Sequence, residues 1–210
     1  MLQRRARRLF CTFLPILVRK QSGATSSDYW NSESSGQFHE MDPASEVMLY
    51  ELLSVSRGKD TSFLDLGCNQ GRHLNYLYEK GYRNLTGVDF SSLAIEKMQK
   101  QFPEMYQASK IINTSFQEYL TNDPAEVDIV YSRGATLEIV HPSFPIIKKI
   151  CQMAKHYVVI VINEAGHAYP RFWEYEFARC GFELTHMRRP ASMETPEHKV
   201  TLMTYRKLPS

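Results

Sequence analysis

The hydrophobic and polar positions of this chain follow two periods, one typical of strands and one typical of helices. Apolar segments rich in β-branched and aromatic residues predict seven strands, at 63–66, 85–89, 110–113, 127–132, 157–162, 182–187 and 198–206. The fifth of these segments is apolar throughout, as expected for a strand that is buried on both faces of its sheet. Apolar residues at helical spacing predict helices at 43–54, 71–80, 92–101 and 171–179.

The residues at the ends of these segments support the predicted helices. Asp42 can cap the first helix, with Pro43 at its first helical position, and Ser91 or Ser92 can cap the third. Pro103 follows the third helix and ends it, because proline cannot continue a helical hydrogen-bond ladder. The segment boundaries therefore agree with the hydrophobic pattern.

Strands and helices alternate through most of the sequence, which predicts an α/β fold. We expect a three-layer sandwich with a mostly parallel seven-stranded sheet, right-handed crossovers and an antiparallel last strand that forms an edge hairpin. A chain of 210 residues with 43% apolar content can bury one substantial core. Residues 37–210 are thus predicted to form one domain, preceded at 1–36 by a basic, apolar leader and a Ser-rich linker.

Charge is distributed unevenly between the leader and the domain. Residues 1–27 carry six basic side chains and no acidic one, whereas the remainder carries 19 basic and 23 acidic side chains. The domain therefore has no overall basic bias of the kind that marks a nucleic-acid-binding surface.

The leader also contains an apolar run at 9–18, interrupted by Pro15. Ten residues are too few to cross a bilayer, which takes about 20, and Arg19 and Lys20 stand where a signal-peptide cleavage site would begin. Three interpretations remain: a disordered or partly helical leader, a basic segment that touches anionic lipid, and an organelle transit sequence. We expect a cytoplasmic protein, with organelle targeting or membrane association through residues 1–20 as the alternative.

The four cysteines are Cys11, Cys68, Cys151 and Cys180, and they form no C-x-x-C pair. This spacing argues against a metal site and against a disulfide framework, and it favours a reducing compartment. Cys68 lies within a glycine-bearing turn but has no neighbouring base in the sequence, so we interpret it as a small space-filling residue.

That turn is the most informative part of the chain. A short strand runs into Phe-Leu-Asp-Leu-Gly-Cys-Asn-Gln-Gly (63–71), and the next strand ends on an acid in Leu-Thr-Gly-Val-Asp-Phe (85–90). Gly67 and Gly71 allow a tight turn and a close approach to a ligand, since neither has a Cβ. Asp89 can accept two hydrogen bonds from a ribose diol. Together they predict a nucleoside-type cofactor site at the carboxyl ends of parallel strands.

The spacing of the glycines narrows the choice of cofactor. The dinucleotide pattern G-x-G-x-x-G fails because Asn69 and Arg72 replace its second and third glycines, and no phosphate-binding G-x-x-x-x-G-K-[ST] loop is present. Asp-Leu-Gly-Cys-Asn-Gln-Gly instead resembles the first motif of class I S-adenosylmethionine-dependent methyltransferases, and Gly-Val-Asp-Phe-Ser resembles their acidic second motif. The resemblance extends from about Phe63 to Tyr205 and implies a methyltransferase that uses S-adenosyl-L-methionine.

The resemblance also implies roles for individual residues. Asp65 would lie near the amino-acid end of the cofactor, Asp89 would bind the ribose, and Phe90 would lie against the adenine. Ser115 and Phe116 would hold the adenine edge. The predicted cofactor-binding residues are Asp65, Gly67, Cys68, Asn69, Gly71, Asp89, Phe90, Ser115, Phe116 and Ser132.

The methyl acceptor should meet the loops that follow the fourth and fifth strands. His141 has the right kind of pKa for a general base, although a histidine that merely contacts its loop is the more common case. Arg133 and Glu138 are candidates for orienting the acceptor. Trp30 and Tyr169 are candidates for an aromatic lid over it.

Substrate class can be approached by exclusion. Family members that methylate amines of nucleic acid bases or glutamine carry an [N/D/S]-Pro-Pro-[Tyr/Phe] tetrad after the fourth strand, and this chain has Ser-Arg-Gly-Ala at 132–135. We therefore expect a small-molecule acceptor methylated on oxygen or nitrogen, and no nucleic acid partner. A protein methyltransferase, or a non-catalytic protein with this fold that binds a partner, is the alternative. The oligomeric state is left open, and the basic N-terminus predicts at most weak contact with a membrane surface.

Overall fold

The computed structural model describes residues 2–19, 39–122, 124–134, 137, 139–163, 169–191 and 200–209. Its strands are β1 (Phe63–Leu66), β2 (Leu85–Asp89), β3 (Lys110–Asn113), β4 (Val127–Arg133), β5 (Ala154–Asn163), β6 (Phe182–Arg188) and β7 (Val200–Lys207). Its helices are α1 (Leu2–Phe13), the 3-10 turn η1 (Pro15–Leu17), α3 (Pro43–Val55), α4 (Arg72–Glu79), α5 (Ser92–Gln101), α6 (Pro103–Ala108), α7 (Phe116–Thr121), α8 (Ile146–Met153) and α9 (Trp173–Ala178).

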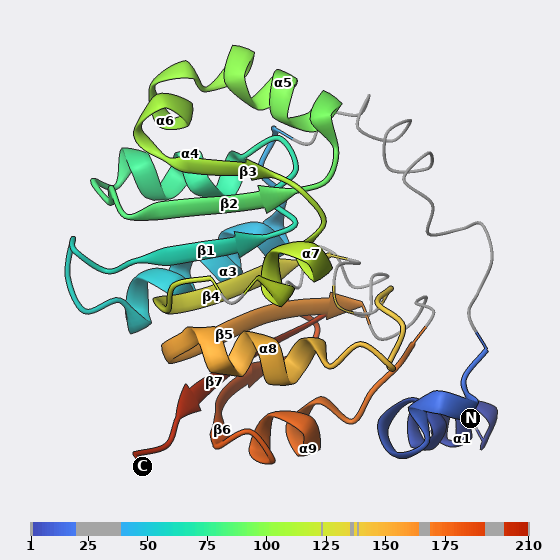
Figure 1. Cartoon of the computed structure of the whole chain (residues 1–210). Coiled ribbons are helices and arrows are strands. Elements are labelled where there is room, and N and C mark those ends of the chain that lie inside the picture. The colour runs from blue at the N-terminus through green and yellow to red at the C-terminus, as the bar shows by residue number, and fades with distance from the viewer. Residues whose placement is uncertain are drawn as a thin grey trace.

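The seven strands form one sheet in the order β3-β2-β1-β4-β5-β7-β6 (Figure 1). Neighbouring strands from β3 to β5 are parallel, whereas β7 runs antiparallel to both β5 and β6. The predicted α/β sandwich with an antiparallel last strand is therefore confirmed. Because β1 and β4 are adjacent and the chain leaves β1 toward β2, the carboxyl ends of these strands form the crevice where α/β proteins bind ligands.

Helices cover both faces of the sheet, and each face has its own buried core. One core contains Phe177 of α9 and Ile150 of α8, and the other contains Met48 of α3, Leu74 of α4 and Met98 of α5. Figure 1 shows α7, α8 and α9 in front of the sheet and α3 and α4 behind it. β1 and most of β4 and β5 are buried, as expected for parallel strands between two helical layers.

The predicted helices at 43–54, 71–80 and 92–101 are confirmed to within one residue, and Asp42 and Ser91 cap α3 and α5 as expected. The helix predicted at 171–179 is shorter, covering only Trp173–Ala178. The helices α6, α7 and α8, which are six to eight residues long, were not predicted. β5 begins at Ala154, three residues earlier than expected, because it follows α8 without a loop.

The N-terminal helix α1 packs against the domain. The hydroxyl of Thr12 accepts a hydrogen bond from the backbone N–H of Phe172 at 3.1 Å, and the ring of Phe13 lies 4.9 Å from that of Tyr175. Cys11 is buried beside Tyr169. Among the described helices, none is both long and apolar enough to cross a membrane. The linker expected at 22–36 lies outside the described residues.

Candidate functional site

The turn between β1 and α4 has the left-handed backbone that its sequence predicts. Gly67, Asn69 and Gly71 have φ angles of 82°, 46° and 77°. Among the described residues, Asn69 is the only one other than glycine with a positive φ. Asparagine adopts this left-handed conformation more readily than most residues do. The turn directs the N–H of Asn69 to Oδ2 of Asp89 at 2.8 Å, so it binds the tip of β2.

Gly71 is held in place by packing as well as by its backbone angle. A Cβ at this position would lie 2.6 Å from Cγ of Met98 and 3.0 Å from Cε of Met105. Glycine at this position therefore permits a close approach of the turn to α5 and α6.

Asp65, in the middle of β1, is fully buried, and neither of its carboxylate oxygens has a hydrogen-bond partner among the described residues. A buried carboxylate without partners is costly, because it has lost its hydration. Nδ1 of His73 lies 3.5 Å from Oδ2 of Asp65. Oδ1 of Asn69 is likewise buried and without a partner in that part of the chain. The site thus carries acceptor atoms that a bound donor can satisfy.

His73 lies behind Asp65 and is neutral. Burial lowers the pKa of its imidazole, and this outweighs the opposing effect of Asp65. Arg72 Nε lies 3.2 Å from Nε2 of the ring, and since a guanidinium can only donate, Nε2 must accept. The ring proton of His73 is therefore on Nδ1, facing Asp65.

Asp89 ends β2 as predicted, with a carboxylate that is only 7% exposed. It accepts hydrogen bonds from the N–H of Asn69 at 2.8 Å and of Ser91 at 2.9 Å. Burial raises the pKa of Asp89, and hydrogen bonds from the backbone of Ser91, Asn69 and Phe90 lower it without cancelling the rise. A carboxylate has about four acceptor positions, so one remains for a ribose hydroxyl.

Cys68 is buried beside the two acids, and its thiol is protonated. Burial raises the pKa of Cys68 well above its usual value, and the charges of Asp89 and Asp65 raise it further. Cys68 packs closely against Gly87 of β2. A Cβ added at Gly87 would lie 2.9 Å from Sγ of Cys68. A protonated, packed thiol agrees with the space-filling interpretation.

The other predicted cofactor residues have identifiable structural contacts. Ser132 donates to the carbonyl of Leu66 at 2.8 Å and so joins the ends of β4 and β1. Ser115 caps α7, and Phe116 belongs to the core. Phe90 is half-buried directly after β2.

A cluster of ion pairs that the sequence did not reveal lies at the same edge of the sheet. Asp42, the N-cap of α3, binds Nη2 of Arg72 at 2.7 Å and Nη2 of Arg133 at 2.6 Å. Burial raises the pKa of Asp42, but the two arginines and the hydrogen bonds from Ser45 lower it by more, so the carboxylate stays ionised. The cluster joins the starts of α3 and α4 to the end of β4. Only the capping role of Asp42 was predicted.

His141 and Tyr169, which we predicted to lie near the methyl acceptor, contact each other and the N-terminal segment. Nε2 of His141 lies 2.8 Å from the carbonyl of Val18, so it donates, and Nδ1 therefore accepts from Ser143. The ring packs edge-on against Tyr169 at 5.1 Å. Both nitrogens are engaged, so this arrangement holds the N-terminal segment in place. Trp30 and Glu138 lie outside the described residues.

Comparisons with known proteins agree with this geometry. Residues 63–156 match the family model described as a methyltransferase domain. No curated protein sequence matches the chain significantly. The matched range 63–156 includes both cofactor motifs and all of β1 to β4.

Solved structures share the fold at low sequence identity. Magnesium protoporphyrin IX methyltransferase from Synechocystis, solved with bound S-adenosylmethionine, is 12% identical with a TM-score of 0.65, over 96% of this chain and 95% of that one. The CcbJ methyltransferase from Streptomyces caelestis is 12% identical with a TM-score of 0.65, over 84% and 92%. A protein from Pyrococcus horikoshii, provisionally assigned as an RNA methyltransferase, is 17% identical with a TM-score of 0.65, over 93% and 96%. At these identities the likeness shows the fold.

Proposed function

Since this chain contains a class I methyltransferase domain and is an S-adenosylmethionine-dependent methyltransferase, we propose that it methylates an oxygen or nitrogen atom of a small molecule. The proposal rests on the position of Arg133 at the end of β4. Family members that methylate bases have a Pro-Pro tetrad at this place, and this chain does not. The guanidinium of Arg133 is held by Asp42, and its Nε is buried without a partner among the described residues. An arginine in this position can donate hydrogen bonds to a polar or anionic acceptor.

The residues of the cofactor site fit S-adenosylmethionine. The buried carboxylate of Asp65, whose contact with His73 is only at 3.5 Å, suits the ammonium of the methionine moiety, and Asp89 keeps an acceptor position for the ribose. When bound, the cofactor supplies a sulfonium methyl group for in-line displacement. The protein aligns the acceptor with that methyl group and excludes water.

The contacts of His141 narrow the acceptor further. Both ring nitrogens are engaged by Val18 and Ser143, so His141 holds no free lone pair for a substrate proton. We therefore favour an acceptor whose lone pair is available near neutral pH without a protein base, such as an aromatic ring nitrogen or an acidic hydroxyl.

Methyl labelling of a cell extract tests the proposal. Purified protein is incubated with labelled S-adenosylmethionine and extract fractions, with Asp89→Ala as the control that binds the cofactor poorly. We expect label in the low-molecular-mass fraction with the wild type alone. Label in protein would favour the protein methyltransferase alternative, and label in RNA would overturn the proposal. Cofactor binding without any transfer would indicate a non-catalytic, partner-binding role.

The N-terminal segment supports a second proposal, concerning location. We propose that it touches an anionic membrane surface through an apolar patch, defined as the exposed side chains Leu9, Phe10, Phe13, Leu14, Ile16 and Leu17. Ile16 is 84% exposed and Leu17 is 65% exposed, and the exposed cations Arg7 and Arg19 flank the patch. Apolar side chains bordered by arginines match the interface of an anionic bilayer.

Sedimentation with lipid vesicles tests this second proposal. We expect the wild type to bind phosphatidylserine vesicles and to be released by high salt, and Ile16→Glu to bind at least tenfold more weakly. Leu208→Glu, at another exposed apolar residue, is the matched control and should bind like the wild type. Equal binding to neutral vesicles, or no binding at all, would contradict the proposal.

A further inference from the structure

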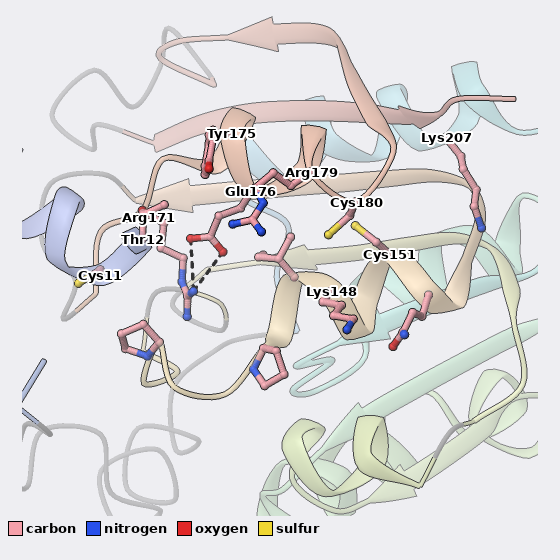
Figure 2. Close-up of a pocket in the computed structure, with 14 residues that line it drawn as sticks. Cys11, Thr12, Lys148, Cys151, Arg171, Tyr175, Glu176, Arg179, Cys180 and Lys207 are labelled. Carbon is pink, nitrogen blue, oxygen red and sulfur yellow. Dashed lines mark hydrogen bonds and ion pairs between the residues drawn. The ribbon is translucent and has the colours of Figure 1, made fainter. Parts of the chain in front are cut away.

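Two cysteines that are far apart in the sequence lie side by side in the structure. Cys151 is on α8 and Cys180 lies two residues after the end of α9, and each thiol affects the ionisation of the other. Figure 2 shows the two sulfur atoms facing one another. Both thiols are free. The sequence spacing that argued against a disulfide framework therefore does not keep these two apart.

The pair lines a cavity of about 620 Å³ on the outer side of α8 and α9. Lys148, Arg179 and Lys207 also line it, as does one acid, Glu176, which is ion-paired with Arg171. The cavity is therefore positively charged on balance, and its volume lies within the range of small-molecule sites. Cys151 is buried within it, while Cys180 is partly exposed.

The two thiols differ in acidity because one donates to the other. The hydrogen bond from Cys151 lowers the pKa of Cys180, although burial opposes it. Arg179 and Lys148 lower that pKa further, against the charge of Glu176. The same hydrogen bond, together with burial, raises the pKa of Cys151, which Lys207 only partly offsets. The more accessible sulfur is thus also the better source of thiolate.

We propose that Cys151 and Cys180 form a reversible disulfide by exchange with a small anionic disulfide such as oxidised glutathione. The cationic cavity provides room for such a reagent, and its lysines and arginine attract the carboxylates. The pair is a modification site that is separate from the cofactor turn and independent of which acceptor is methylated.

The exchange proceeds in two balanced steps. The Cys180 thiolate attacks one sulfur of oxidised glutathione, the S–S bond of that molecule breaks, and a glutathione thiolate leaves. Cys151 then loses its proton and attacks the Cys180 sulfur, which releases the second glutathione. The two protein thiols are oxidised by two electrons, one glutathione disulfide is reduced, and the two protons finish on the two glutathione thiols.

A disulfide between Cys151 and Cys180 would link α8 to the end of α9. Both helices follow loops that we expect to lie near the methyl acceptor. α8 follows the loop that carries His141, and α9 follows the segment that carries Tyr169 and Phe172. A disulfide between Cys151 and Cys180 therefore fixes the helices that follow these two loops relative to each other. Oxidation is expected to raise the Tm, because the cross-link restricts the unfolded chain.

Mass spectrometry of the full-length protein, equilibrated in glutathione buffers and then alkylated, tests the proposal. We expect a mass loss of two hydrogens, two thiols that no longer alkylate, and one joined peptide pair containing Cys151 and Cys180. Reduction should reverse all three changes. Alkylation of Cys180 should have a midpoint below pH 8.5, the value of an ordinary cysteine.

Three serine variants make the test specific. Cys151→Ser should accumulate one glutathione on Cys180, because no second thiol can displace it, whereas Cys180→Ser should stay largely unmodified. Cys11→Ser, which changes another cysteine of the same cavity wall, should cross-link like the wild type. A wild type that stays fully reduced, keeps a stable glutathione adduct, or cross-links through Cys11 would overturn the proposal. This conclusion needs only the wild type, so it does not depend on how the variants fold.

Discussion

The tips of β1 and β2 and the tips of β4 and β5 lie along one edge of the sheet, yet they are built in different ways. At β1 and β2, Asp65 and Asp89 are buried acids whose positions are set by the two strands and by the five-residue turn 67–71 between β1 and α4. At β4 and β5, Arg133 and His141 are held by Asp42 and Val18, which lie 91 and 123 residues away in the sequence. We call the tips of β1 and β2 the donor side and the tips of β4 and β5 the acceptor side. The donor side is determined by residues close to it in the sequence, whereas the acceptor side depends on distant parts of the chain.

This difference has a physical consequence for how each side responds to change. A local turn fails when its backbone angles or its immediate packing are disturbed. A surface assembled by long-range contacts fails when a distant segment moves, even if its own residues are intact. Four substitutions test the contrast, from the largest expected effect to the smallest.

Gly71→Ala should have the largest effect and should act on the donor side. The new Cβ meets Met98 at 2.6 Å in a residue whose φ is 77°, so we expect a loss of about 2–4 kcal/mol of unfolding free energy. Gly181→Ala is the matched control, because it has a φ of 79° but no atom within 4 Å of its Cβ. Urea titration should show a clearly smaller loss for the control, and equal losses would show that packing at Gly71 contributes nothing.

Asp89→Ala should weaken S-adenosylmethionine binding by roughly ten- to a hundred-fold. It removes a charged acceptor, which is worth about 1.5–3 kcal/mol, and it frees the N–H groups of Asn69 and Ser91. Asp128→Ala is a matched control, since this residue accepts two hydrogen bonds from Ser62 at the opposite end of β4. Calorimetry should find the control unchanged. An unchanged Kd for the Asp89 variant would remove it from the cofactor site.

His141→Ala tests the acceptor side. Loss of the hydrogen bond to the Val18 carbonyl, worth about 0.5–1.5 kcal/mol, should release the N-terminal segment and speed tryptic cleavage at its arginines. Once an acceptor is known, kcat should fall less than tenfold. A fall of more than a hundredfold, with loss of the acidic limb of the pH profile, would instead make His141 the general base. His156→Ala, an exposed histidine near Asp128, is the control.

Asp42→Asn tests the junction between the two sides and should have the smallest effect. Asparagine keeps the helix cap but removes the ion pairs with Arg72 and Arg133, so we expect a loss of about 0.5–1 kcal/mol at pH 7. Because the pKa of Asp42 is lowered from 3.8 in the folded protein, this stability is present above that value and is lost as the pH falls through the folded pKa. Denaturation curves of the two proteins should therefore converge below about pH 3.8. A constant difference down to pH 2 would show that the charge is not responsible.

The left-handed backbone of the turn after β1 and the position of Asp89 at the end of β2 could be predicted from the sequence, because their signals are contiguous. Gly67, Gly71 and Asp89 sit at fixed distances from apolar strands, and the angles and hydrogen bonds that they adopt follow from residue type. The order of the elements followed from their alternation. Length alone does not explain why α6, α7 and α8 were missed, since α4 and α9 are equally short. α6 begins at Pro103, which we interpreted as the end of a helix.

The acceptor side could not be predicted in the same way. Nothing near Arg133 in the sequence indicates that Asp42 will bind it, and the carbonyl of Val18, which fixes His141, carries no sequence signal at all. Nothing in the spacing of Cys151 and Cys180 indicates that they line the same cavity, for the same reason. Long-range contacts depend on packing that a single sequence does not display.

The place of β7 in the sheet has a consequence for synthesis of the protein. β7 lies between β5 and β6, although it comes after both in the chain, and its residues Val200–Arg206 pair with Tyr157–Asn163 of β5. While a ribosome is still translating the segment before Val200, the apolar β5 has one open edge that no other part of the sheet can cover. Open edges of apolar strands recruit other chains. Pausing of translation before β7 should therefore be the step at which this protein most needs a chaperone.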